Sequence, residues 1–162
     1  MVIRYVILKF GRRDFNMIQR ILDDPRGWRG QNYIFVDVDD ITEADVIISK
    51  ESSARMKRRF TAPELYGLSV TTRYTDGRPA EIWIHADNWN KVPPDFVGSK
   101  RLYREYVIQH EMGHVLGYNH ERPINISELC PVMYQQTKGT RGICKSNPWV
   151  RSSRLGMPAV PP

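Results

Sequence analysis

The stretch that most constrains the fold is residues 110–120, HEMGHVLGYNH, which contains three of the four histidines of this 162-residue chain. His110 and His114 are four residues apart, so on an α-helix they lie on the same face, one turn from each other. Glu111 follows the first histidine, and Gly117 can adopt the left-handed conformation that ends many helices. The chain can then turn back and bring His120 close to the other two imidazoles.

Three neutral imidazoles that meet at one point are suitable ligands for Zn²⁺, which binds histidine nitrogen at about 2.0–2.1 Å. Three protein ligands leave the fourth position open, which is typical of catalytic zinc sites and not of structural ones. Zinc lowers the pKa of a bound water to about 7 and polarises a peptide carbonyl. We therefore predict His110, His114 and His120 as ligands of one Zn²⁺. Glu111 is predicted as the general base that takes the proton of the attacking water.

The first part of the chain predicts an α+β fold with a mixed sheet. Residues 2–9, 33–38 and 44–49 are rich in branched and aromatic side chains and are predicted as strands. A helix is predicted between the first two strands, with Asp14 as its N-cap and Asp24 at its end. Strand, helix and strand at this spacing indicate a right-handed crossover.

A hairpin is predicted further along the chain, where residues 68–74 and 80–86 flank the sequence TDGR. Asp-Gly between two β-rich runs is a strong hairpin signal, so these strands should be antiparallel. Ser99 is the expected N-cap of the helix that carries the histidines. His85, in the second strand of the hairpin, can line the cleft or add a second metal. A histidine in a strand is, however, more often exposed or hydrogen-bonded.

The two cysteines, Cys130 and Cys144, allow two interpretations. If they pair, they close a loop of about 15 residues, for which chain-entropy models give roughly 3 kcal/mol. A pair of this kind indicates an oxidising compartment. The alternative is two free, buried thiols in a reducing cell.

Composition is that of a soluble globular domain, with a net charge of +6 and 41% hydrophobic residues. The basic cluster at residues 55–59 is predicted as a solvated surface, because no nucleic-acid-binding motif accompanies it. No apolar run approaches the roughly 20 residues of a membrane span. The start, MVIRYVILKF, has no small-residue cleavage site and is predicted as a strand, not a signal peptide. It follows that the protein is not exported by that route, or that the sequence is trimmed.

The sequence HEMGHVLGYNH resembles the zinc-binding signature of the metzincin clan of metallopeptidases. Three further blocks extend the likeness: DPRGW at 24–28, CPVMYQQT at 130–137, and C-x-x-NPW at 144–149. Together the blocks are similar to a little-characterised, mostly actinobacterial family of metzincin-like proteins, often exported. This resemblance implies that Met133 forms the Met-turn beneath the metal and that Cys130 pairs with Cys144.

The clan resemblance also implies the fold in more detail. We expect a compact zincin with a mixed, mostly parallel sheet, an antiparallel edge strand, a backing helix and an active-site helix. Residues 1–117 would form an upper subdomain and 118–150 a short lower one, in a single catalytic domain spanning 1–150. Residues 151–162 are expected to be a flexible tail.

Some clan members place a tyrosine near the metal, two residues beyond the methionine. Here Tyr134 follows Met133 directly, so transition-state support and simple packing both stay open for it.

The function expected from these observations is zinc-dependent endoproteolysis of an extended polypeptide. One alternative is a catalytically silent zinc-binding protein of the same fold that acts as a protein-binding module; the intact Glu111 argues against it. Another is a basic nucleic-acid binder with structural zinc, which the open ligand position argues against.

We expect a monomer without a nucleic-acid partner. The expected disulfide and the resemblance favour a secreted protein, although no signal peptide is recognised. A surface role beside Arg122 is expected for Glu121, in place of the astacin-like contact with a mature N-terminus.

Overall fold

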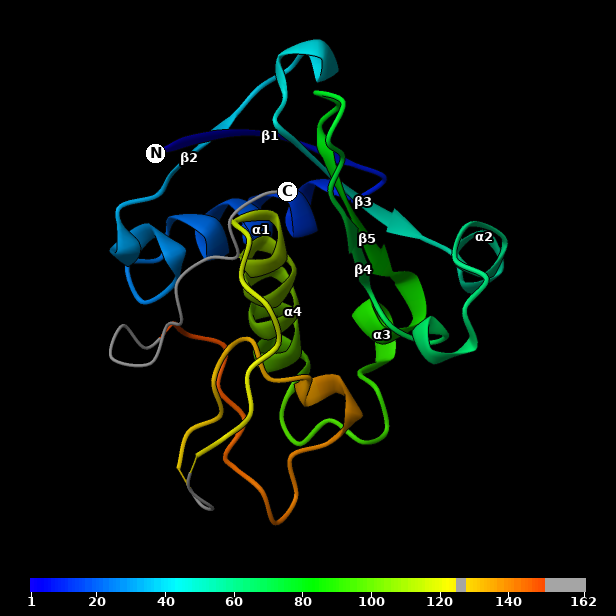
Figure 1. Cartoon of the computed structure of the whole chain (residues 1–162), viewed down its shortest axis with the longest axis vertical. Helices are drawn as coiled ribbons and strands as arrows, with labels where there is room; N and C mark the ends of the chain where they lie inside the picture. The colour runs from blue at the N-terminus through cyan, green and yellow to red at the C-terminus, as the bar shows by residue number, and fades with distance from the viewer. Residues whose placement is uncertain (125–127, 151–162) are drawn as a thin grey trace.

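The computed structural model describes residues 1–124 and 128–150. At its centre is a five-stranded sheet with the order β2-β1-β3-β5-β4 (Figure 1). Neighbouring strands are parallel from β2 to β5, and only β4, at the edge, runs antiparallel to its neighbour. The predicted α+β fold with a mixed sheet and an antiparallel edge strand is therefore confirmed. The strands are β1 (Val2–Leu8), β2 (Ile34–Asp37), β3 (Val46–Glu51), β4 (Val70–Thr72) and β5 (Ala80–His85).

Two helices cover one face of the sheet and enclose the apolar core between helix and strand. Ile18 and Leu22 of α1 and Ile108 of α4 pack in one cluster with Ile82 and Ile84 of β5, and all five are fully buried. Helix α4 crosses the centre of the molecule in Figure 1. The α-helices are α1 (Arg12–Asp23), α2 (Ser53–Arg59), α3 (Ala86–Lys91) and α4 (Lys100–Val115).

The opposite face of the sheet carries Trp83 and His85, because side chains alternate along a strand. Phe60, which follows α2, packs edge-on against Trp83 with ring centroids 5.4 Å apart. The basic cluster at residues 55–59 belongs to the short helix α2, which the sequence reading did not predict. Its arginines and lysine are exposed, as expected for a solvated surface.

The predicted N-cap of the first helix is wrong. Helix α1 begins at Arg12 with Gly11 as its N-cap, and Asp14 lies inside the helix. The Asp14 carboxylate instead accepts a hydrogen bond from Trp89 Nε1 at 2.9 Å and one from Arg104 Nη1 at 3.3 Å. Asp14 therefore forms a long-range ion pair, although the local preference of aspartate for N-cap positions predicts it at the start of the helix.

Beyond Gly117 the described chain contains little regular structure. We call residues 118–124 and 128–150 the closing segment, and residues 1–117 the sheet–helix part. Within the closing segment the one helical element is a short 3-10 turn, η4 (Gln136–Lys138). The expected flexible tail at 151–162 lies outside the described residues. Among the helices that are described, none has the length and apolarity needed to cross a membrane.

Candidate metal centre and active site

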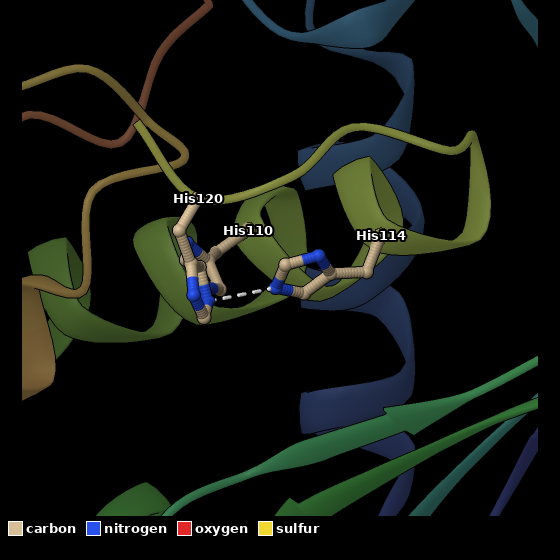
Figure 2. A group of neighbouring side chains, drawn as sticks. All are labelled: His110, His114 and His120. Atoms are coloured by element: carbon tan, nitrogen blue, oxygen red, sulfur yellow. Dashed lines mark hydrogen bonds between the residues drawn. The ribbon is translucent and has the colours of Figure 1, made fainter. Parts of the chain in front are cut away.

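Helix α4 places His110 and His114 on one face, as their spacing predicts. The helix begins at Ser99, whose side chain accepts a hydrogen bond from the Leu102 amide at 3.1 Å, so the predicted N-cap is confirmed. Figure 2 shows the imidazoles of His110, His114 and His120 pointing toward one another. One ring nitrogen from each lies within 4.8 Å of the others.

The turn at Gly117 brings His120 to this cluster. Gly117 has φ 94°, a left-handed conformation that favours glycine. The Gly117 amide donates to the His114 carbonyl at 3.0 Å, and the Tyr118 amide donates to the Gly113 carbonyl at 2.9 Å. This pair of bonds is the Schellman pattern of a helix C-terminus. The chain then reverses, and the Nε2 atoms of His120 and His114 lie 3.1 Å apart (Figure 2).

Backbone carbonyls fix the orientation of the two helical imidazoles. His110 Nδ1 lies 2.8 Å from the Val132 carbonyl oxygen, and His114 Nδ1 lies 2.9 Å from that of Tyr118. A carbonyl can only accept, so each Nδ1 carries the proton and each Nε2 keeps its lone pair for a ligand. Hydrogen bonds of this kind commonly orient histidines that bind metals.

The protonation of the cluster also suits a cation. Burial, together with the neighbouring His114, lowers the pKa of His110 to about 3. Burial lowers the pKa of His120 to about 4 and lowers that of His114 as well. Neutral imidazoles are the form that binds metal. Two nitrogens bound to one tetrahedral zinc at about 2.0–2.1 Å would lie roughly 3.4 Å apart, close to the separation of His114 and His120. The donor set therefore fits zinc.

Glu111 lies beside the histidines and contacts the edge strand. It is only 5% exposed, and burial raises the pKa of its carboxyl to about 7. The Thr71 hydroxyl of β4 lies 2.6 Å from Glu111 Oε2 and 3.2 Å from the Glu111 carbonyl oxygen. Thr71 was not identified from the sequence. The signal available was the alternation of the hairpin strand, which places Thr71 on the face toward α4.

A cleft of about 390 Å³ runs between strand β4 and the turn after α4. Its floor includes the three histidines and Glu111, so the predicted site residues open onto one surface. Within the described ranges, sixteen residues line it: Leu65, Leu68, Ser69, Val70, Thr71, Arg73, Tyr106, His110, Glu111, His114, Gly117, Tyr118, Asn119, His120, Gln135 and Thr137.

Met133 packs directly beneath the helix that carries the histidines. It is fully buried, and Gly113 gives it room. A Cβ added at Gly113 would collide with the Met133 sulfur and would lie 2.7 Å from the Trp28 ring. Trp28 is itself fully buried and donates its indole N–H to the Gln109 carbonyl at 2.7 Å. The glycine inside the motif therefore permits close packing beneath the helix that carries His110 and His114.

The segment around Met133 is held by covalent and polar links. Cys130 and Cys144 form a disulfide, which resolves the two interpretations of the sequence in favour of pairing. Gln136, fully buried, donates to the carbonyls of Pro131 and Asn147 at 3.1 and 2.7 Å. The Asn147 amide donates back to Gln136 Oε1 at 2.9 Å. These contacts position the Val132 carbonyl that binds His110.

The remaining predicted residues occupy different surroundings. Tyr134 is half-buried and is not among the described residues that line the cleft; its carbonyl accepts from the Tyr106 hydroxyl at 3.0 Å. The Glu121 amide donates to the Met133 carbonyl at 3.0 Å. His85 does not line the cleft. It is 5% exposed, so it is not an exposed histidine, and its Nδ1 has no hydrogen-bond partner in the described part of the chain.

Comparisons with known proteins give a family match without an activity. A family described as a protein of unknown function (DUF3152) matches residues 9–148. No curated protein matches the chain. Among solved structures, myroilysin is similar with a TM-score of 0.48 and 15% sequence identity, over 79% of this chain and 54% of that one. The chain thus spans about half the length of myroilysin.

Proposed function

The chain belongs to the DUF3152 family, whose function is not known, and for this member we propose a zinc-dependent endopeptidase of the metzincin type. The observation that carries the proposal is the convergence of three histidine nitrogens within 4.8 Å beside the buried carboxylate of Glu111. A purely structural site would have no evident use for a carboxylate at this place. The arrangement is the one expected for hydrolysis of a peptide bond.

One Zn²⁺ would be held by the Nε2 atoms of His110, His114 and His120. In the first two histidines Nδ1 is hydrogen-bonded to a backbone carbonyl oxygen, so Nε2 is the nitrogen left for the metal. Bound zinc would lower the pKa of a water and polarise the peptide carbonyl. Met133 would form the Met-turn, because it is fully buried against Gly113 beneath these ligands. Tyr134 is not among the described residues that line the cleft, so any support of the transition state by this residue would come from outside that lining.

Glu111 would perform the proton transfers. Its carboxylate takes a proton from the water that attacks the scissile carbonyl and then gives a proton to the leaving amine. The short contact from the Thr71 hydroxyl restricts the carboxylate to one orientation, because Oε2 is the acceptor and Oε1 stays available. Thr71 is therefore assigned as a positioning residue for the general base.

Strand β4 would bind the substrate. It is the last strand of the sheet, so one of its edges carries backbone groups without a neighbouring strand in the described residues. An extended polypeptide can add to such an edge through main-chain hydrogen bonds. Because Thr71 of this strand contacts Glu111, the added peptide would pass the general base.

The setting of this activity follows from the same features. We place the catalytic domain at residues 1–150, acting as a monomer, with the closing segment as its lower part. The disulfide between Cys130 and Cys144 favours an oxidising compartment outside the cell. The substrate class is an extended or unfolded polypeptide.

Metal analysis together with digestion of casein tests the proposal. We expect about one zinc ion per chain, loss of digestion after chelation, and recovery when zinc is returned. His114→Ala should bind zinc much more weakly, whereas Asn119→Ala, a cleft residue outside the ligand set, should retain it. If the chain binds one zinc and cleaves no member of a broad peptide library, the silent binding-module alternative replaces this proposal.

A further inference from the structure

Arg73 differs from the other cationic side chains around the hairpin. It is exposed, lines the cleft and follows directly after strand β4. In the described ranges no hydrogen bond or ion pair joins it to another residue. By contrast, Arg59 donates to the Tyr74 hydroxyl at 2.8 Å, and Arg78 forms an ion pair with Asp76 at 2.8 Å. The guanidinium of Arg73 is therefore available to a ligand.

The position of Arg73 along the chain relative to Thr71 indicates where its guanidinium lies, since both residues line the cleft. Side chains two residues apart point to the same face of an extended chain and are separated by about 7 Å along it. Arg73 is two residues beyond Thr71, whose hydroxyl contacts Glu111. It therefore lies along the cleft, at a distance of one or two residues of extended substrate from the reacting bond.

The distribution of charged residues in the cleft indicates which substrate side chains Arg73 could bind. Among the described residues that line the cleft, Arg73 is the sole lysine or arginine and Glu111 the sole carboxylate. Glu111 is buried and bonded to Thr71, so it is not placed to neutralise Arg73. Lining residues at the other end of the strand, such as Leu65 and Leu68, are aliphatic. The cleft thus has one cationic end and one apolar end.

We propose that Arg73 selects polypeptides that carry aspartate or glutamate one or two residues from the position beside the metal site. A guanidinium offers a planar pair of donors that matches a carboxylate, which distinguishes an acid from its neutral amide. The inference rests on the proposed function, because that function places a polypeptide substrate along β4. It adds the chemical class of the side chain that the cleft prefers.

Paired peptides that differ by a single Glu-to-Gln exchange, scanned along the sequence, test the inference. Binding is measured by fluorescence anisotropy to zinc-loaded Glu111→Gln protein, and cleavage is measured with wild type. With the exchange at one position of the peptide, we expect the glutamate peptide to bind about fivefold more tightly than its glutamine partner. A factor of this size is typical of a solvent-accessible charge pair. The preference should shrink with added salt. Arg73→Gln should remove it, and Arg73→Glu should favour lysine instead.

Arg78→Gln is the matched control, because this exposed arginine belongs to the same hairpin and does not line the cleft. It should keep the preference for glutamate. Equal binding of glutamate and glutamine peptides at every position, or a preference that survives Arg73→Gln, would overturn the inference. If the preference depends on Arg73 but wild type cleaves no peptide, the selectivity stands and the proposed peptidase function fails.

Discussion

Two parts of the molecule build the candidate site by different physical means. The sheet–helix part, residues 1–117, buries isoleucine and aromatic side chains between a five-stranded sheet and two helices. The closing segment has a single short 3-10 turn in its described residues and is linked by a disulfide and by the buried amides of Gln136 and Asn147. Both parts reach the same histidines. The comparison indicates that regular packing places His110 and His114, whereas the irregular closing segment supplies His120 and orients His110 through the Val132 carbonyl.

The largest expected effect follows from removing the covalent link of the closing segment. Replacing both Cys130 and Cys144 by serine should lower the free energy of unfolding by about 3 kcal/mol, because the closed loop no longer restricts the unfolded chain. Zinc affinity should fall as well, since the Val132 carbonyl that orients His110 lies in this loop. Urea denaturation and zinc titration measure the two quantities.

The same variant shows whether the two parts are separable. Circular dichroism should retain the helical signal of the sheet–helix part at zinc concentrations where the metal no longer binds. Ile143→Ser, an exposed neighbour of Cys144, is the control and should leave both quantities unchanged. Unaltered zinc affinity in the double serine variant would show that the closing segment does not orient the ligands.

A smaller effect is expected from the polar network. Gln136→Ala leaves the Asn147 amide and two buried carbonyls without their partner, which costs about 1–3 kcal/mol. The exposed neighbour Lys138→Ala should change the free energy of unfolding by much less. Thermal or urea unfolding measures both. An equal effect of the two substitutions would mean that the buried amides contribute little to this segment.

The sheet–helix part could largely be predicted from the sequence, whereas the path of the closing segment could not, apart from its disulfide. Alternating and helical periodicities located its five strands and the helices α1 and α4, and Ser99 gave the start of α4. The helix start at Asp14 failed because that carboxylate pairs with Arg104 and Trp89, residues distant in sequence. The short helices α2 and α3 were missed, since a single buried residue in each gives no periodic signal.

The residues of the candidate site also differ in how far the sequence could identify them. Motif spacing was sufficient to identify His110, His114 and His120, whose nitrogens do converge. Val132 and Gln136 act through backbone and amide contacts within an irregular chain, and no pattern in the sequence marks such contacts. Thr71 lay in a correctly predicted hairpin, but its pairing with Glu111 depends on how the sheet packs against α4. Long-range packing is what a local reading lacks.

Thr71 belongs to the regular sheet–helix part, and we propose that it positions Glu111 without binding metal. Thr71→Val removes the hydroxyl at nearly constant shape and should lower kcat about tenfold, or about 1.4 kcal/mol in barrier. KM and zinc content should stay near wild type, and Thr71→Ser should recover most of kcat. Thr72→Val, on the opposite face of β4, is the matched control. A fall in zinc content would indicate a structural role instead.

The smallest effect is expected at the beginning of helix α4. Ser99→Ala removes the acceptor of the Leu102 amide and should cost about 1 kcal/mol of stability. Zinc affinity should be unchanged, since Ser99 is eleven residues from His110 and the intervening helix is anchored in the core by Tyr103, Tyr106 and Ile108. Ser99→Asp retains an acceptor and should behave as wild type. A large loss of zinc affinity on Ser99→Ala would show that the regular part is less rigid than its packing indicates.

The most direct measurement compares kcat/KM of zinc-loaded wild type and Glu111→Gln on one extended peptide, with zinc content determined for both. The substitution preserves the size of the side chain and removes the base. The predicted result is equal zinc content with a decrease in kcat/KM of at least about 100-fold, the usual contribution of a general base. Cleavage by Glu111→Gln at the wild-type rate, or no cleavage by either protein, would contradict the assignment of this site as a peptidase centre.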